Sequence, residues 1–200
     1  MVEIKASAVK ELRGKTGCGL MECKNALKDS GGDMQGAIEG LRKKGLASAA
    51  KKSGRSTSEG LIYSYIHAGS KIGVLLEINC ETDFVARTDD YQNLSKDICM
   101  QIAAANPQYV SREEIPEEII AKEKEIIMAQ VGDKPQNILD KIVAGKIEKG
   151  FYAQVCLLDQ PFVKDNDKSI NDIIVEAVAK LGENIQVRRF TCYRLGEALD

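Results

Sequence analysis

The chain has 200 residues, of which 44% are hydrophobic and 29% are charged. This balance is ordinary for a globular protein and excludes the collagen-like and intrinsically disordered classes. Lys and Arg number 28 and Asp and Glu number 30, which gives a formal net charge of -2. Such a charge argues against a protein that mainly neutralises nucleic-acid phosphates. No apolar run reaches the length of about 18 residues that a membrane span needs, so we expect no membrane segment.

Charge is unevenly distributed along the chain. Residues 1–55 carry 12 Lys and Arg against 6 Asp and Glu, so this segment is basic and the remainder is acidic. The asymmetry indicates two units. We predict a three-helix N-terminal domain over 1–45, a Ser-, Gly- and Lys-rich linker over 46–58, and an α+β core domain over 59–200. A helical conformation at the Ala-rich start of the linker stays open.

The N-terminal segment has the apolar spacing of three short helices. The first is expected to start at Ser7 as a candidate cap, and the second follows the turn at 17–19. The third is expected to begin after Asp33 as its N-cap and to end at Gly45. The apolar positions of these helices are Val9, Leu12, Leu20, Cys23, Leu27, Ala37, Ile38 and Leu41.

The rest of the chain predicts a mixed α+β fold. Apolar residues alternate over 61–67 and 72–80, which is typical of two strands joined as a hairpin. We expect an antiparallel sheet of at least four strands with helices on one face. The further elements, in chain order, are a helix over 89–105 capped by Thr88, a helix after Pro116 that buries Ile119, Ile120, Ile126 and Ile127, a short helix after Pro135, a strand over Phe151–Leu158, a helix near 169–181 and a strand near 185–194.

Known catalytic signatures are missing from the sequence. The chain has one histidine, His67, and lacks the Gly-x-Ser-x-Gly, Walker A and Gly-x-Gly-x-x-Gly patterns. Its six cysteines are irregularly spaced and are interpreted as reduced, cytoplasmic core thiols, with too few neighbouring ligands for zinc. A Cys80–His67 pair is the remaining candidate for a thiol enzyme, although no residue that would orient the histidine is indicated. We therefore expect no metal site.

A competing interpretation is an RNA-binding or ribosome-binding module. No aromatic residue interleaves with the basic residues of the N-terminal half to stack on bases. Charged faces of this kind are usually solvated, and we expect no direct binding of nucleic acid. The basic residues that such a module would use are Lys43, Lys44, Lys51, Lys52 and Arg55.

The segment over 79–87, Asn-Cys-Glu-Thr-Asp-Phe-Val-Ala-Arg, stands out. It leaves a predicted strand and precedes a helix whose apolar stripe begins only at Tyr91, so Phe84 does not belong to that stripe. Thr82 and Asp83 are favourable at a helix entry and would fix a short turn. Two interpretations stay open. Phe84 packs beneath the helix, or it is exposed next to Asp83 as an anchor for a partner's pocket.

Four motifs occur in order along the chain. They are Glu-Leu-Arg-x-x-Thr-Gly over 11–17, Tyr-Ile-His-Ala-Gly over 65–69, Asn-Cys-Glu-Thr-Asp-Phe-Val-Ala over 79–86 and Gln-Pro-Phe-Val-Lys over 160–164. Together they resemble the bacterial elongation factor Ts family in its short form. The resemblance covers essentially the whole chain, to the closing Leu-Gly-Glu over 195–197.

The resemblance implies a guanine-nucleotide exchange factor for elongation factor Tu, acting in the cytoplasm during translation elongation. Such a protein is not an enzyme and holds no cofactor. The family places Thr82, Asp83, Phe84 and Val85 in the segment that enters the partner's nucleotide domain, displaces its magnesium ion and loosens GDP. It also implies that the N-terminal helices form a bundle similar to a ubiquitin-associated domain, which docks on the same nucleotide domain.

The resemblance assigns four further positions to partner binding, namely Arg13, Leu20, Met21 and His67. Many relatives carry two methionines where this chain has Leu20 and Met21, a change that nearly conserves volume. For His67, a solvated strand end is the alternative. Long family members duplicate the core, whereas this chain has one copy of each motif, which implies a homodimer and a two-plus-two complex with the partner. Whether Cys192 bridges two subunits stays open.

Overall fold

The computed structural model describes residues 4–132 and 134–198. The chain divides into two compact units. The first unit contains Met1–Gly60, Asn79–Gln92 and Ile173–Gln186, and the second contains Leu61–Ile78, Asn93–Asp172 and Val187–Asp200. The division into domains over 1–45 and 59–200 stays a prediction.

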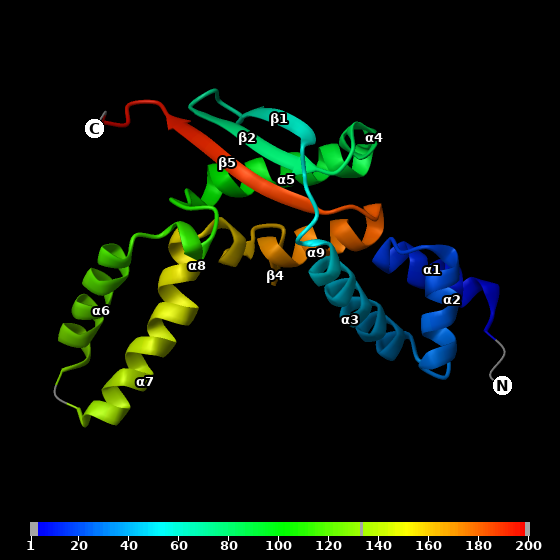
Figure 1. The fold of residues 1–200 in the computed structure, drawn as a ribbon, viewed down its shortest axis with the longest axis horizontal. Coiled ribbons are helices and arrows are strands. Elements are labelled where there is room, and N and C mark those ends of the chain that lie inside the picture. The colour runs from blue at the N-terminus through cyan, green and yellow to red at the C-terminus, as the bar shows by residue number, and fades with distance from the viewer. Residues whose placement is uncertain (1–3, 133, 199–200) are drawn as a thin grey trace. The chain divides into compact units, whose positions relative to one another are not determined.

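Three helices begin the first unit, α1 (Ala6–Thr16), α2 (Leu20–Asp29) and α3 (Met34–Lys52), coloured from blue to teal in Figure 1. The predicted cap of α3 is confirmed, because the Asp33 side chain accepts hydrogen bonds from Gln35 N and Gly36 N. The helices share one buried cluster, which contains most of the apolar positions that the spacing predicts: Val9, Leu12, Cys23, Leu27, Ala37 and Leu41. Burial of this shared cluster stabilises α1 and α2, which have 11 and 10 residues and are individually too short to be stable in water.

Two predicted boundaries in these helices are wrong. The first helix already begins before Ser7, which therefore lies inside its first turn. The third helix continues through Gly45 to Lys52. A Cβ atom added at Gly45 would lie 3.3 Å from the Cβ atom of Ala179. Glycine at position 45 therefore permits close packing of α3 against α9 (Ile170–Leu181), which contains Ala179. Gly45 does not end α3.

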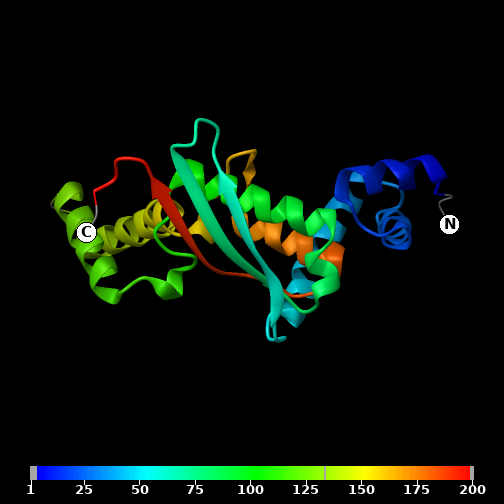
Figure 2. The ribbon, with the colours of Figure 1, turned by 90° about the horizontal axis from the view of Figure 1, so that it is seen from above.

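Within the described residues, the main sheet has three strands in the order β1–β2–β5. They are β1 (Glu59–Ile66), β2 (Ile72–Cys80) and β5 (Ile185–Arg194). The predicted hairpin joins β1 to β2, and His67 N donates to Ile72 O at 2.9 Å where the two strands meet. Helix α5 (Asp89–Ala105) runs along one face of this sheet in Figure 1 and Figure 2.

The fold class is α+β, as predicted, but the expected single sheet of at least four strands is wrong. A separate antiparallel pair forms from β3 (Pro161–Phe162) and β4 (Asp165–Ser169). The strand predicted over Phe151–Leu158 is also wrong. That segment forms the π-helical turn η2 (Ile147–Phe151), α8 (Tyr152–Val155) and the 3-10 turn η3 (Leu157–Asp159).

The helices predicted after Pro116 and Pro135 are confirmed. After the 3-10 turn η1 (Arg112–Glu114) they form α6 (Glu117–Val131) and α7 (Gln136–Lys146). Ile127 of α6 and Val143 of α7 share a buried cluster with Ile147 of η2. Ile126 was expected in the core, but its side chain is 51% exposed. The helix and strand predicted near 169–181 and 185–194 are α9 (Ile170–Leu181) and β5. No helix in the described part of the chain has the length and apolar character of a membrane span.

Candidate functional site

The TDFV segment, Thr82–Val85, follows β2 in the first unit and forms most of α4 (Asp83–Ala86). Phe84 is 76% exposed. Of the two interpretations left open by the sequence, the structure therefore shows the one in which the Phe84 ring is exposed. The buried residue of α4 is Ala86. A single helical turn presents an aromatic side chain at the protein surface.

The carboxylate of Asp83 lies in an exposed ion pair. Arg87 Nη2 donates to Asp83 Oδ2 at 2.7 Å, one helical turn away. Exposed pairs of this kind contribute at most about 1 kcal/mol. Asp83 can therefore exchange Arg87 for another cation at little cost in stability.

Glu183 holds the start of the TDFV segment through both of its carboxylate oxygens. Its Oε2 atom accepts hydrogen bonds from Glu81 N at 3.1 Å and Thr82 N at 3.0 Å. Its Oε1 atom accepts from Thr82 Oγ1 at 2.6 Å. Thr82 occupies the N-cap position of α4 without a side-chain cap bond, and its hydroxyl group donates to Glu183.

Glu81 makes the reciprocal contact to the turn that contains Glu183. Its Oε1 atom accepts from Asn184 N at 2.7 Å and from Arg55 Nη1 at 3.3 Å. The Asn184 amide, and then the charge of Arg55, lower the pKa of Glu81 below its usual value. Sequence reasoning missed Glu183 and Asn184, because they lie about a hundred residues from the motif and match no sequence signature.

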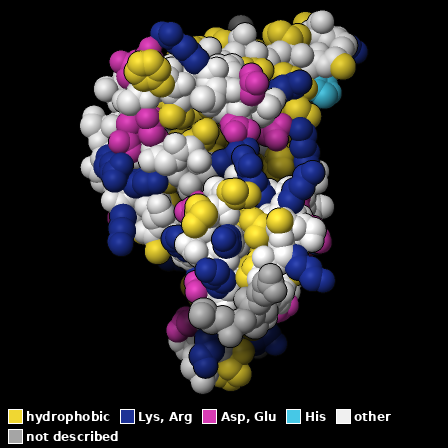
Figure 3. Space-filling view, turned by 90° about the vertical axis from the view of Figure 1, so that its right-hand side faces the viewer, with side chains coloured by type: hydrophobic (Ala, Val, Ile, Leu, Met, Phe, Trp, Pro, Cys, Tyr) yellow, Lys and Arg dark blue, Asp and Glu magenta, His cyan; other side chains and the backbone are white. Residues whose placement is uncertain are grey.

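Two exposed aliphatic side chains lie at the start of α2 in the same compact unit. Leu20 is 55% exposed and Met21 is 61% exposed. Arg13 is exposed on α1. Figure 3 views the molecule from the side on which α1 and α2 lie in Figure 1, and it shows hydrophobic side chains at the surface among Lys and Arg side chains. The first unit therefore carries Phe84, Leu20, Met21 and Arg13 as exposed groups.

Comparison with known proteins decides the family. The family model described as "Elongation factor TS" matches residues 48–197. Elongation factor Ts of Anaeromyxobacter sp. (strain Fw109-5) is 61% identical over 202 residues, which cover 100% of this chain and 92% of that protein. This chain belongs to the elongation factor Ts family. Elongation factor Ts of Desulforamulus reducens (strain ATCC BAA-1160 / DSM 100696 / MI-1) is 58% identical (100% and 93% covered), and that of Thermoanaerobacter sp. (strain X514) is 56% identical (98% and 97% covered).

His67, the remaining residue that the elongation factor Ts resemblance singled out, lies in the second unit. Its side chain is exposed just beyond β1, and its Nδ1 atom lies 2.9 Å from Tyr65 Oη. An exposed imidazole in this position is available to a partner and is equally compatible with a solvated strand end. Its role in partner binding stays a prediction.

The alternative of a thiol enzyme has little structural support in this member of the elongation factor Ts family. Cys80 is fully buried, and its Sγ atom donates to Thr82 O at 3.1 Å. Burial raises the pKa of the Cys80 thiol, so it stays protonated at neutral pH. All six cysteines are free thiols, and the described residues include no group of three or more His, Cys, Asp or Glu side chains arranged to hold a metal ion.

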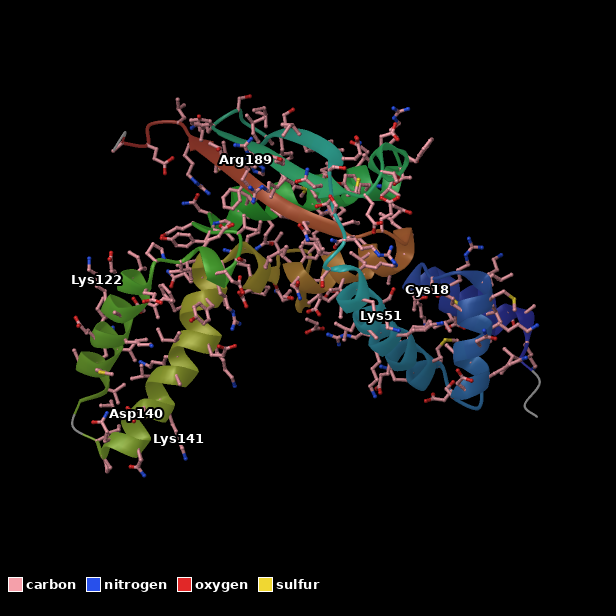
Figure 4. All side chains as sticks on the ribbon, viewed as in Figure 1. Cys18, Lys51, Lys122, Asp140, Lys141 and Arg189 are labelled. Carbon is pink, nitrogen blue, oxygen red and sulfur yellow. The ribbon has the colours of Figure 1, made fainter. Side chains whose placement is uncertain are left out.

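Two of the basic residues considered for RNA binding, Lys44 and Arg55, lie in ion pairs with carboxylates. Lys51, labelled in Figure 4, is exposed near the end of α3. Arg55 instead pairs with Glu81. On β5, Arg189, also labelled in Figure 4, donates from Nε to Glu77 Oε2 at 2.6 Å. Some of the exposed basic side chains are therefore paired with carboxylates of this chain.

Proposed function

We propose that this chain is a guanine-nucleotide exchange factor that binds elongation factor Tu–GDP and promotes GDP release by displacing the magnesium ion. It acts in the cytoplasm during translation elongation and makes no covalent change in its partner. Membership of the elongation factor Ts family supports the exchange role. The observation that carries the mechanism is the 76% exposure of Phe84 beside the Asp83 carboxylate.

In this proposal Thr82, Asp83, Phe84 and Val85 enter the partner's nucleotide domain. The Phe84 ring gains an apolar environment there that it lacks on its own protein surface. The Asp83 carboxylate attracts the magnesium ion as an alternative oxygen ligand and repels the diphosphate. Both effects weaken the GDP site without a chemical step.

The required free energy exceeds what one side chain supplies. Because coupling between two ligands is reciprocal, a factor that weakens GDP binding is itself bound more weakly, by the same ratio, when GDP is present. A thousandfold effect corresponds to about 4 kcal/mol of contacts that the GDP-bound partner cannot make. Burial of one phenylalanine supplies about 1.5–3 kcal/mol. Phe84 therefore needs help from Asp83 and from docking contacts elsewhere.

Exposed residues of α1 and α2 are proposed to supply those docking contacts. Leu20 and Met21 are exposed aliphatic side chains, and Arg13 adds a positive charge. When these residues dock on the partner's nucleotide domain, they hold the TDFV segment near the nucleotide at a high effective concentration. His67 is proposed to contact another domain of the partner.

The second part of the proposal is a homodimer, which gives a two-plus-two complex with elongation factor Tu. The chain carries one TDFV segment, and its main sheet leaves large apolar residues exposed, as a covered surface would require. These residues are Ile62, Ile66, Leu75 and Tyr193, and Leu195 is exposed just after the end of β5. Sedimentation should show a dimer at micromolar concentration. A fully active monomer would contradict the dimer.

Release of fluorescently labelled GDP from elongation factor Tu tests the exchange role. We expect the chain to accelerate release, and we expect excess Mg²⁺ to reduce that acceleration because metal displacement is part of the mechanism. Release that is no faster with the chain than without it would contradict the proposed function.

A further inference from the structure

We infer that Glu183 is a positioning residue for nucleotide exchange, because its carboxylate fixes the direction in which the TDFV segment leaves the sheet. The inference rests on the proposed function and adds to it a residue outside the four sequence motifs. Glu183 lies in the turn between α9 and β5. It is expected to act through Thr82 without touching the partner.

The hydrogen bonds of Glu183 converge at Thr82 and its neighbour Glu81. Thr82 has extended backbone angles, φ -133° and ψ 153°, and α4 begins at the next residue. The change from strand to helix therefore takes place where Glu183 accepts the Thr82 amide, the Thr82 hydroxyl group and the Glu81 amide. Hydrogen bonds to an ionised acceptor are stronger than those between neutral groups.

α4 itself is too short to fix its own direction. It contains 4 residues, about one helical turn, and an isolated turn of this length is unstable in water. Its ion pair, Asp83 with Arg87, joins two residues of the same turn and does not anchor it to the rest of the unit. The side-chain contacts with Glu183 provide an anchor from a distant part of the sequence.

The anchor is itself held in place. Asn184 N donates to Glu81 Oε1 at 2.7 Å, and Asn184 Nδ2 donates to Ser53 O at 3.2 Å and Arg55 O at 2.9 Å. The turn at 183–184 is therefore bonded both to the TDFV side and to the segment after α3. Loss of the Glu183 carboxylate should free the TDFV segment while Asn184 keeps the turn in place.

Preorganisation of the TDFV segment should raise the maximal rate of GDP release. A segment that is already oriented loses less conformational entropy when it inserts into the partner. Docking through the N-terminal helices does not use Glu183. We therefore expect Glu183 to affect the maximal rate of GDP release at saturating factor more than the concentration that gives half of that rate.

The test compares Glu183→Gln with Glu39→Gln, a control that makes the same change at an exposed residue of α3. The Gln side chain keeps the shape of Glu but replaces one acceptor oxygen with a donor. We expect Glu183→Gln to lower the maximal rate about tenfold, which is about 1.4 kcal/mol in the activation free energy. We expect its half-saturating concentration to stay within about twofold of wild type. Glu39→Gln should match the wild type in both.

A second variant separates positioning from general damage to the fold. Thr82→Val removes the hydroxyl donor to Glu183 and keeps the backbone amide bonds. We expect a smaller loss of maximal rate, about threefold, and little further loss when Thr82→Val is combined with Glu183→Gln, because the two changes break the same contact. Should Glu183→Gln fail to fold by circular dichroism, a wild-type maximal rate in Thr82→Val would overturn the inference.

The outcomes distinguish this inference from the proposed function. A wild-type chain that does not accelerate GDP release overturns the proposed function and the inference with it. If the wild type accelerates release and Glu183→Gln equals Glu39→Gln, the inference alone is overturned. A raised half-saturating concentration with an unchanged maximal rate, or fully additive losses in the double variant, would also overturn it.

Discussion

Glu81 and Glu183 each use a side-chain carboxylate to bind the backbone of the other residue's turn. Glu183 accepts the amide of Glu81 at 3.1 Å, and Glu81 accepts the amide of Asn184, next to Glu183, at 2.7 Å. The two glutamates are 102 residues apart in the sequence. The end of β2 and the start of β5 are therefore fixed together, and the TDFV segment is presented from this junction.

The Glu81 carboxylate should make folding stability depend on pH in the acid range. The Asn184 amide and Arg55 lower the pKa of Glu81 from its ordinary value of 4.5. A carboxyl group with a lowered pKa contributes stability above its unfolded pKa, and that stability is lost as the pH falls through the folded pKa. Urea unfolding at a series of pH values should show a shallower loss of stability below pH 4.5 in Glu81→Gln than in the wild type.

The matched control for this measurement is again Glu39→Gln, whose pH profile should follow that of the wild type. A Glu81→Gln profile that runs parallel to the wild-type profile down to low pH would contradict the role assigned to this carboxylate.

The cap of α3 should contribute measurably to the stability of the N-terminal helices. Asp33 Oδ2 accepts from Gly36 N at 2.8 Å, and Oδ1 accepts from Gln35 N at 3.3 Å. Loss of an N-cap carboxylate typically costs about 1 kcal/mol, so Asp33→Ala should lower the free energy of unfolding by that amount. Asp29→Ala removes an acid from the end of α2, where the helix dipole disfavours it, and should cause no loss. Equal losses in the two variants would contradict the cap.

The Gln-Pro-Phe-Val-Lys motif is held by a buried amide network. Gln101 Nε2 donates to Gln160 Oε1 at 3.0 Å and Pro161 O at 3.2 Å, and Gln101 Oε1 accepts from Val163 N at 2.9 Å. Gln101 is 1% exposed and Gln160 is 2% exposed. Gln101→Leu would leave these polar groups without partners, at a cost of about 1–3 kcal/mol each.

We therefore expect Gln101→Leu to lower the free energy of unfolding by about 3 kcal/mol in urea titrations. Gln154→Leu makes the same change at an exposed side chain and should alter stability by less than about 0.5 kcal/mol. A Gln101→Leu variant as stable as Gln154→Leu would show that the network does not stabilise this region.

Elements with strong periodicity were predictable from the sequence. Helix α5 is an example, because Tyr91, Leu94, Ile98 and Ile102 are buried at steps of three and four. Its predicted cap is also present, since Thr88 Oγ1 accepts from Tyr91 N at 3.3 Å. In both cases the signal lies within a few neighbouring residues, where spacing and capping chemistry determine the structure.

The segment over 151–158 was not predictable in the same way. Its aromatic and aliphatic residues favour a strand, but a short apolar run can equally be a buried helix. Tertiary contacts decide the outcome, because Val155 and Cys156 are buried against Ile115. The helical path continues from α7 through η2 into α8.

Only the local part of the candidate site was predictable from the sequence. The position of Phe84 outside the α5 stripe left open an exposed ring, and the structure shows it exposed. The residues that hold the TDFV segment were not predictable, because Glu183 and Asn184 contact it across a long sequence separation. Polar residues in a turn carry no local signal for such a contact.

The most direct test of the account measures GDP release from elongation factor Tu with Phe84→Ala and Asp83→Asn. Ile138→Ala, which truncates another exposed apolar residue outside the proposed site, is the control. Burial of a phenylalanine is worth about 1.5–3 kcal/mol. We therefore predict a loss of stimulation of at least about tenfold for Phe84→Ala and a clear loss for Asp83→Asn, with urea unfolding curves like that of the wild type. Stimulation by both variants at the level of Ile138→Ala would contradict the role of this exposed ring and its neighbouring carboxylate.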